Sequence, residues 1–547
     1  MSSLSPLNTP LGLRRAKHLL RRATFNYSKS QLDAIASMTA FDAVNSLAIS
    51  LENTLSEPFD PLPSASPDGF WTSSAIAPAT FSGQTRKKAL VTGWWWYNAI
   101  NQTTLKHKLS FFLHTSFTVG KDSGSGNSSN FYDHVRLLDY YAYGNLKTLA
   151  KKITLDNSML YYLDNTSNIA TNPNENYARE FLELFTILKG PQIGNGNYTN
   201  YTEIDIQQAA KVFSGFRQQN DRTIIDSNTN IPRGYGNSSK HSTVNKTFSA
   251  AFNNQVIVGK NTEAGMFEEL NDFVDMVFTQ PETAKAYCRK LYKFFVKREW
   301  NETVETDIIT PLSQLLISNN FEILPVVKTL LASEHFYDAD DGEPTNNIIG
   351  SIVKSPLQIL TEVCTMFNLN IPNPTTDALR YYTNFYLYFI HNVYLRGAGM
   401  DFYNPDSVAG YPAHYQEPDF DRLWFSSNTL IARYKLIESL IIGKNTITSG
   451  GNIYTKLDTV LFVKNTISNP SNPNNLVTEI ANLLYPESIV TDRTNYFKTF
   501  LVDVGFPDYY WTGAWNDYIN TNDSTTVKIR LDALITAMVN AAEFQLM

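Results

Sequence analysis

Residues 172–188, NPNENYAREFLELFTIL, predict a long helix that is buried in its second half. Asn172 can cap the helix, Pro173 suits the first helical position, and Glu175 follows the cap by three residues, where its carboxylate can accept the N–H of the cap. Apolar side chains then recur with the period of a helix, and after Phe181 they cover nearly the whole circumference. A helix that is apolar on all sides is buried, so this stretch predicts a helical core.

Two carboxylates, Glu180 and Glu183, lie beside or within this apolar surface. An ionised carboxylate is costly there unless it is paired, bound to a metal or protonated. With Asn176 and Arg179 the two form the best polar cluster of the chain, because residues three and four apart share one face of a helix. A structural interpretation competes with this one, since Glu175, Arg179 and Glu183 have the spacing of an intrahelical ion-pair ladder.

The composition predicts one large globular body. The chain has 547 residues, of which 43% are hydrophobic and 13% aromatic, without a long linker, a run of like charge or a repeat. A net charge of −7 with scattered Lys and Arg is unlike a nucleic-acid-binding surface. No apolar run is long enough for a membrane span, and residues 1–22 lack the apolar segment of a signal peptide. We therefore expect no nucleic-acid partner and no membrane span, and we expect Cys288 and Cys364 in the core rather than in a disulfide or a metal site.

The periodicity of apolar residues, close to 3.6 along most of the chain, predicts a mostly α fold. We expect a large multi-helix body with a small β-rich insertion and long irregular loops. The expected regions are an N-terminal helical core at 1–216, the β-rich insertion at 217–262, a second helical layer at 263–394, a loop layer at 395–418 and a C-terminal helical region at 419–547.

Blocks along nearly the whole chain follow one family pattern. They include HLLRRATF at 18–25, KLSFFLHTSF at 108–117, DNSMLYYLDN at 156–165, NENYAREFLELFTI at 174–187, YTEIDIQQAAKVFSGF at 201–216, SEHFYD at 333–338 and GSIVKSPLQIL at 350–360. These blocks resemble the bacterial family called domain of unknown function 1800. The resemblance implies a mostly helical protein of the cell envelope or a secreted protein. It also implies a sulfatase-like partner encoded nearby and a pathway that acts on a polysaccharide or another envelope polymer.

The chain departs from this family pattern at polar positions. His114 is kept in FLHTSF, but Ser116 stands where the pattern has a second histidine. In HSTVNK, His241 and Lys246 are kept, whereas Ser242 replaces an acidic residue. If those groups bind a metal or transfer protons in relatives, this chain has lost part of the set.

The candidate chemistry is a metal-assisted reaction. His114, Glu180 or Glu183 and His241 are the natural ligands for a divalent transition metal such as zinc or iron, and the same four residues are the candidate catalytic groups. His107 is excluded as a partner of His114, because seven residues of helix separate the two by about 10 Å. The alternative for His114 is a hydrogen-bonded core histidine, and no HExxH motif supports a metal directly.

Further binding candidates come from aromatic and loop residues. Successive residues of a helix point about 100° apart, so at least one of the tryptophans at 94–96 is expected at a groove or interface, and Trp95 is the candidate for stacking on a sugar or a partner protein. His414 lies in the expected loop layer, where a functional loop would place it. Together with Asn176, Arg179 and Lys246, these residues form the candidate binding set.

Two hypotheses about function remain open. The first is an envelope-associated hydrolase, assisted by a metal and acting on a polysaccharide or another envelope polymer. The second is a non-catalytic binding or assembly protein that works with the sulfatase-like partner. The sequence contains no nucleophile elbow, no phosphate-binding Gly loop and no dinucleotide fingerprint, so serine hydrolases, NTPases and Rossmann enzymes are set aside.

Overall fold

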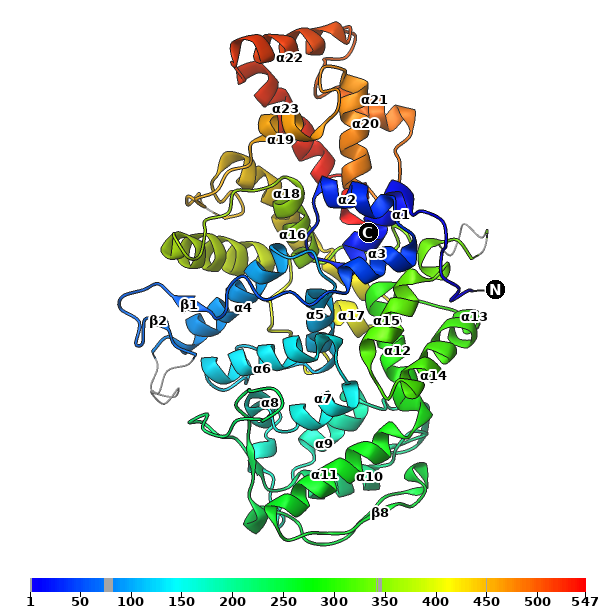
Figure 1. Cartoon of the computed structure of the whole chain (residues 1–547). Coiled ribbons are helices and arrows are strands. Elements are labelled where there is room, and N and C mark those ends of the chain that lie inside the picture. Colours follow the sequence, from blue (N-terminus) through cyan, green and yellow to red (C-terminus); the bar gives the residue numbers. More distant parts are fainter. Residues whose placement is uncertain (1, 73–81, 341, 343–346, 449) are drawn as a thin grey trace.

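The structure is a computed structural model that describes residues 2–72, 82–340, 342, 347–448 and 450–547. Its helices hold most of these residues, and the sheets among them are all antiparallel pairs of short strands (Figure 1). The predicted mostly α fold class is therefore confirmed. In this part of the chain no helix is both long and apolar enough to cross a bilayer.

The first half of the chain forms ten α-helices among the described residues. They are α1 (Gly12–Ala23), α2 (Lys29–Ala36), α3 (Ala40–Leu47), α4 (Gln84–Ile100), α5 (Lys106–Ser116), α6 (Ser128–Tyr140), α7 (Leu146–Ile153), α8 (Asn157–Tyr162), α9 (Asn176–Glu180) and α10 (Glu203–Phe213). A π-helical turn, η4 (Phe181–Phe185), follows α9 directly.

The second half continues with α11 (Glu263–Phe278), α12 (Pro281–Phe295), α13 (Glu302–Val304), α14 (Thr310–Ser318), α15 (Ile323–Ala332), α16 (Pro356–Met366), α17 (Pro412–Tyr415), α18 (Ser427–Ile442), α19 (Thr459–Thr466), α20 (Pro473–Leu484), α21 (Thr491–Lys498), α22 (Tyr509–Thr521) and α23 (Thr525–Val539). Two further π-helical segments are η7 (Glu305–Ile309) and η9 (Leu379–Leu395).

The strands form four two-stranded antiparallel sheets in the described part. They pair β1 (Phe59–Asp60) with β2 (Gly69–Phe70), β3 (Gln192–Gly194) with β4 (Asn197–Tyr198), β5 (Phe216–Arg217) with β6 (Tyr235–Gly236) and β7 (Lys246–Thr247) with β8 (Val256–Ile257). The last two sheets are formed by the segment between α10 and α11, where the sequence predicted a small β-rich insertion.

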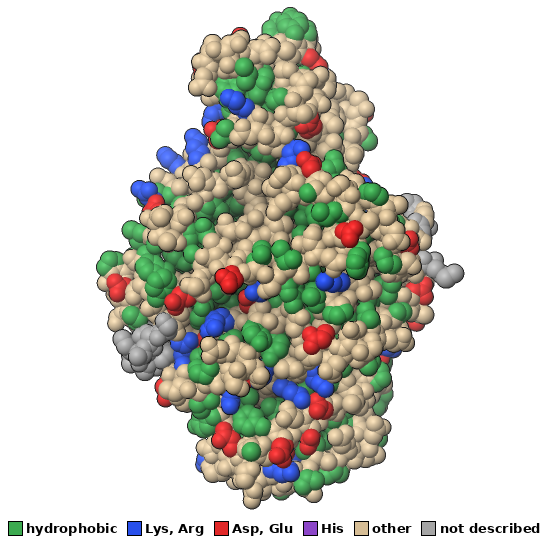
Figure 2. Space-filling model, viewed as in Figure 1, with side chains coloured by type: hydrophobic (Ala, Val, Ile, Leu, Met, Phe, Trp, Pro, Cys, Tyr) green, Lys and Arg blue, Asp and Glu red, His purple; other side chains and the backbone are tan. Residues whose placement is uncertain are grey.

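Helix α5 lies near the middle of an elongated molecule (Figure 1). Helices α19 to α23 form one end, and α7 to α11 with β8 form the other. α5 packs against α6 and α12, and nearly all its side chains are buried. On the face shown in Figure 2, acidic and basic side chains are interspersed.

The three consecutive tryptophans of α4 are all buried, so the expectation of a surface tryptophan was wrong. Trp94 packs on α6, Trp95 on α5 and residues 402–403, and Trp96 on η9. Three directions about 100° apart can all be apolar when neighbours surround a helix. Trp95 is 1% exposed and offers no platform to a ligand.

The helix predicted at 172–188 is shorter in the structure, and both of its ends differ from the prediction. It begins at Asn176 rather than after Asn172, whose backbone pairs instead with Ile169 in an isolated bridge. Asn174 provides the local start, because its side-chain oxygen accepts the Asn176 N–H at 3.0 Å. After Glu180 the backbone widens into η4, and the segment ends there.

Cys288 and Cys364 are buried free thiols, as predicted. Each lies in a helix, Cys288 in α12 and Cys364 in α16. Burial raises the pKa of both thiols well above the ordinary value, so they stay protonated and behave as small core residues.

Candidate functional site

His114 lies on α5 in an aromatic environment. Its ring packs on Tyr403 with 4.2 Å between ring centroids, and neither ring nitrogen has a hydrogen-bond partner among the described residues. Burial, with a smaller contribution from His134, lowers its pKa well below the ordinary value. His114 is therefore a neutral core imidazole that packs among aromatic rings.

His241 belongs to a different buried cluster. Its Nδ1 lies 2.7 Å from the carbonyl oxygen of Ser214, and its Nε2 lies 3.2 Å from Oε1 of Glu269 on α11. Lys246 donates to the other oxygen of Glu269 and to the carbonyl of Ser242. This cluster ties the segment before α11 to that helix, and Glu269 is a member that the sequence analysis missed.

Arg179 of α9 is the centre of an ion-pair network with three carboxylates, those of Glu175, Glu183 and Glu203. Arg179 lies 2.5 Å from Glu203 of α10, 3.3 Å from Glu175 and 3.6 Å from Glu183. Asn176 donates to the carbonyl of Leu163 at 3.2 Å, outside the network. The ladder predicted as the structural alternative is present, and Glu203 extends it to the next helix.

Glu180 has a different setting from the network beside it. It is half-buried, and its pKa is raised first by burial and then by the neighbouring charge of Glu183. Glu183 is held by Arg179 and by Lys189, whose Nζ lies 2.9 Å away. These groups stabilise the junction of α9 with its surroundings and account for most of the polar cluster without a ligand.

The predicted metal ligands do not come together. His114 sits among rings, His241 is held by Glu269, and Glu180 lies beside the network around Arg179. Within the described ranges, no group of three or more His, Cys, Asp or Glu side chains is arranged to hold a metal ion. The arrangement of these residues does not fit the metal site that the sequence suggested.

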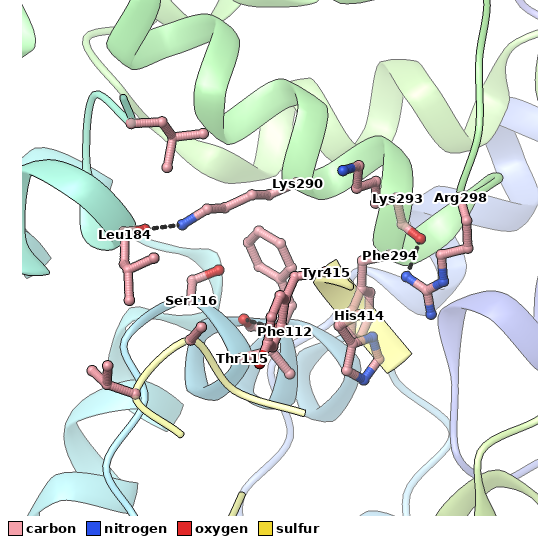
Figure 3. A pocket seen from close by; sticks show the side chains of 13 residues that line it. Phe112, Thr115, Ser116, Leu184, Lys290, Lys293, Phe294, Arg298, His414 and Tyr415 are labelled. Carbon is pink, nitrogen blue, oxygen red and sulfur yellow. Dashed lines mark hydrogen bonds between the residues drawn. The ribbon is translucent and has the colours of Figure 1, made fainter. Parts of the chain in front are cut away.

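A cavity of about 190 Å³ lies between α5, η4, α12 and α17. Figure 3 shows side chains from all four elements pointing into it. Its lining consists of Phe112, Thr115, Ser116, Leu184, Leu188, Lys290, Lys293, Phe294, Arg298, Val408, Ala409, His414 and Tyr415. The basic side chains lie on the side of α12, and the described residues contribute no carboxylate to the lining.

Two of the cations have acidic partners that are not part of the cavity lining. Lys293 lies 3.7 Å from the exposed Glu417, and Arg298 lies 3.8 Å from Asp421, with neither acid in the cavity wall. Arg298 also donates to the carbonyl of Lys293 (Figure 3). Burial lowers the pKa of Arg298 to about 10, so its guanidinium is charged at neutral pH.

Lys290 is the third cation, and it has no acidic partner among the described residues. Its ammonium donates to the carbonyl of Leu184 (Figure 3). That carbonyl is available because η4 is a π-turn: the Leu188 N–H bonds back to Leu182 at 2.9 Å rather than to Leu184. Burial, and next the charge of Lys293, lower the pKa of Lys290 to about 7.

His414 completes the polar lining. Its ring stacks on that of Phe294 with 5.9 Å between the ring centroids. Neither ring nitrogen has a hydrogen-bond partner among the described residues. Burial and then the charge of Arg298 lower its pKa well below the ordinary value, so the imidazole is neutral. Ser116 faces the same cavity from the end of α5 (Figure 3).

Of the residues singled out from the sequence, the cavity gathers His414 and Ser116. Lys290, Lys293 and Arg298 were missed. A signal was present, since KLYKFFVKR at 290–298 places basic residues three and five apart between aromatic ones. The two lysines, three residues apart, share one face of α12, and Arg298 follows just after the helix ends.

Comparison with known proteins gives a family and nothing finer. No curated protein and no solved structure matches the chain. A sequence model of one family matches residues 18–546, which is nearly the whole chain. The chain therefore belongs to the family described as "Protein of unknown function (DUF1800)".

Proposed function

We propose that this protein binds the anionic group of a small molecule, or of an end unit of a polymer, in the cavity beside α12. One observation carries the proposal: three basic side chains and a histidine line a cavity to which the described part of the chain contributes no carboxylate. Lys293 and Arg298 each have one acidic partner outside the cavity lining, whereas Lys290 has none among the described residues. A cation in such a site without a counter-charge is costly, and an incoming anion would supply that charge.

The size and chemistry of the cavity define the ligand class. About 190 Å³ is below the ~300–1,000 Å³ of ordinary small-molecule pockets. Such a space holds a small acid or one terminal group rather than a length of polymer. Apolar side chains such as Phe112, Leu184 and Val408 line the rest, so the anion would carry an apolar or ring-shaped body.

Carboxylate, sulfate and phosphate groups share the chemistry that Arg298 and Lys293 recognise. An acidic sugar at the end of an envelope polysaccharide presents such a group, so this site supports the binding hypothesis with a polysaccharide ligand. Metal-assisted hydrolysis receives no such support, because its predicted residues lie in separate clusters.

Isothermal titration at low salt tests the proposal with acetate, sulfate, phosphate and glucuronate, and with glucose as the neutral control. We expect at least one anion to bind and glucose not to bind. A charge-assisted hydrogen bond contributes about 1.5–3 kcal/mol, so Arg298→Gln should weaken binding about 10- to 150-fold. Higher salt should weaken it further, since screening reduces the attraction.

Lys285→Gln is the matched control, because Lys285 lies on the same helix but pairs with Glu282 at 3.3 Å outside the cavity. It removes the same charge from α12 and should leave the affinity unchanged. Equal losses in Lys285→Gln and Lys293→Gln would show that the cavity is not the binding site. Binding of none of the anions would overturn the proposal.

A further inference from the structure

We propose that Lys290 is a reactive amine that condenses with the carbonyl group of an anionic carbonyl compound, such as a 2-oxo acid, while Lys293 and Arg298 hold its acid group. The inference rests on the proposed anion binding and names a covalent site within it.

The position of Lys290 fits this role. It is half-buried and reaches from α12 across the cavity, where its amine contacts the Leu184 carbonyl (Figure 3). The ring of Tyr287 lies 5.9 Å from its Nζ. No carboxylate of the described residues contributes to its electrostatic environment, so nothing acidic holds the proton on the amine.

The charged and titratable groups around this amine favour its neutral form. Besides burial, the neighbouring cation Lys293 lowers the pKa of Lys290, while Arg298, the neutral His414 and Tyr415 also line the cavity. With a pKa of about 7, roughly half of the Lys290 side chains carry a free amine at neutral pH, against about one in 2,500 for an ordinary lysine. Desolvation and a neighbouring cation are the two means by which proteins activate a lysine as a nucleophile.

The reaction balances without a further reagent. The amine lone pair attacks the carbonyl carbon, and proton transfer gives a carbinolamine. Loss of one water molecule then forms the C=N bond of an imine. Addition of water reverses the sequence and returns both reactants. No electron transfer takes place.

Two other lysines supply an internal comparison. Burial also lowers the pKa of Lys108 and Lys354 to about 7. Lys108, however, is held by Gln358 and Lys354 by Glu362, and neither lines the cavity. Of these three lysines only Lys290 lines the cavity, where its amine contacts a backbone carbonyl, so a reagent should distinguish it.

The experiment traps the imine in the full-length protein. Glyoxylate and sodium cyanoborohydride at neutral pH and low salt convert an imine into a stable carboxymethyl-lysine, which peptide mass spectrometry assigns to a residue. We expect Lys290 to be modified at least about tenfold faster than any other lysine, because a larger fraction of its amine is neutral than at surface lysines and because, unlike Lys108 and Lys354, it lines the cavity. Adducts spread evenly over surface lysines would overturn the proposal.

Variants separate the role of each group. Lys290→Arg keeps the positive charge but removes the primary amine, so it should lose the adduct at position 290. Lys293→Gln should shift the pH midpoint of Lys290 modification upward, since it removes the neighbouring charge; an unshifted midpoint would contradict the activation. Lys285→Gln should change neither rate nor midpoint.

A neutral aldehyde distinguishes this inference from the proposed function. If Lys293 and Arg298 hold the acid group, Arg298→Gln should slow modification by glyoxylate about tenfold or more and leave modification by glycolaldehyde unchanged. Fast modification of Lys290 by glycolaldehyde, with no anion binding by titration, would uphold the reactive amine and overturn the anion site. Anion binding without selective modification would uphold the site and overturn the reactive amine.

Discussion

Glu362 on α16 is the acidic centre of a buried group of cations, and replacing it should be strongly destabilising. Its Oε2 lies 2.6 Å from Nζ of Lys354, while its Oε1 accepts from Gln358 at 2.9 Å and lies 3.4 Å from Nε of Arg21. The side chains of Glu362, Lys354 and Arg21 are at most 3% exposed. Although burial raises it, these cations hold the pKa of Glu362 below the ordinary value.

We expect Glu362→Gln to lower the free energy of unfolding by about 3–5 kcal/mol at pH 6, because it leaves buried charges uncompensated. Glutamine keeps the shape of the side chain, so the loss reports the charge. The control is Glu438→Gln, whose partner Lys435 lies 3.1 Å away at the surface with both side chains about 40% exposed. That change should cost only about 0–1 kcal/mol.

The pH dependence gives the prediction a second test. Burial lowers the pKa of Lys354 from 10.5 to about 7. Between pH 7 and 10.5 the unfolded chain therefore binds more protons at Lys354 than the folded protein does. The cost of burying the charged amine lowers the free energy of unfolding in full below pH 7 and fades as the pH rises. Above pH 7 the amine becomes neutral, and less charge is left without a partner in the variant. The loss caused by Glu362→Gln should therefore be smaller at pH 9 than at pH 6.

Urea denaturation followed by tryptophan fluorescence at pH 6 and pH 9 measures both effects. The reasoning is refuted if the variant loses no more stability than the Glu438→Gln control at pH 6. It is equally refuted if the loss grows as the pH rises.

Four shorter predictions concern the cavity and the core. Anion affinity, measured by titration from pH 6 to pH 8, should fall as the pH passes about 7, because burial and Lys293 lower the pKa of Lys290 to about 7 and its positive charge is lost; a flat profile would exclude Lys290 from binding. Trp95→Ala should lower unfolding stability by about 3–5 kcal/mol, since Trp95 is 1% exposed, and denaturation that is unchanged would contradict its place in the core. Gly93→Ala should cost about 1–3 kcal/mol in the same assay, because an added Cβ would lie 2.7 Å from Cδ1 of Tyr386. Glu180→Ala should change stability by less than about 0.5 kcal/mol and leave the metal content of the purified protein unaltered by elemental analysis; loss of bound metal would restore the sequence-based metal site.

Local patterns in the sequence were sufficient for the helices and for the family. The period of apolar residues depends on the geometry of a helix alone, so it located the helical body and predicted the buried thiols of Cys288 and Cys364. The ladder around Arg179 was also visible, because its spacing of four is a property of one helix.

Details that depend on neighbouring elements were not predicted. The burial of three consecutive tryptophans requires partners on every side of α4, and those partners come from α5, α6 and η9. The π-turn η4 stands where the sequence predicted the end of a helix. The Leu184 carbonyl of η4 accepts a hydrogen bond from Lys290, which lies 106 residues later in the chain.

The sequence by itself determined the mostly α fold and the family, because helical periodicity and motif blocks are read from residues close together in the chain. Only the tertiary structure decided the candidate site. It separated His114, Glu180 and His241, and it brought Ser116, Lys290 and His414 to one cavity. The physical reason is that the cavity and the lowered pKa of Lys290 arise from packing and desolvation between elements distant in sequence, which no local pattern records.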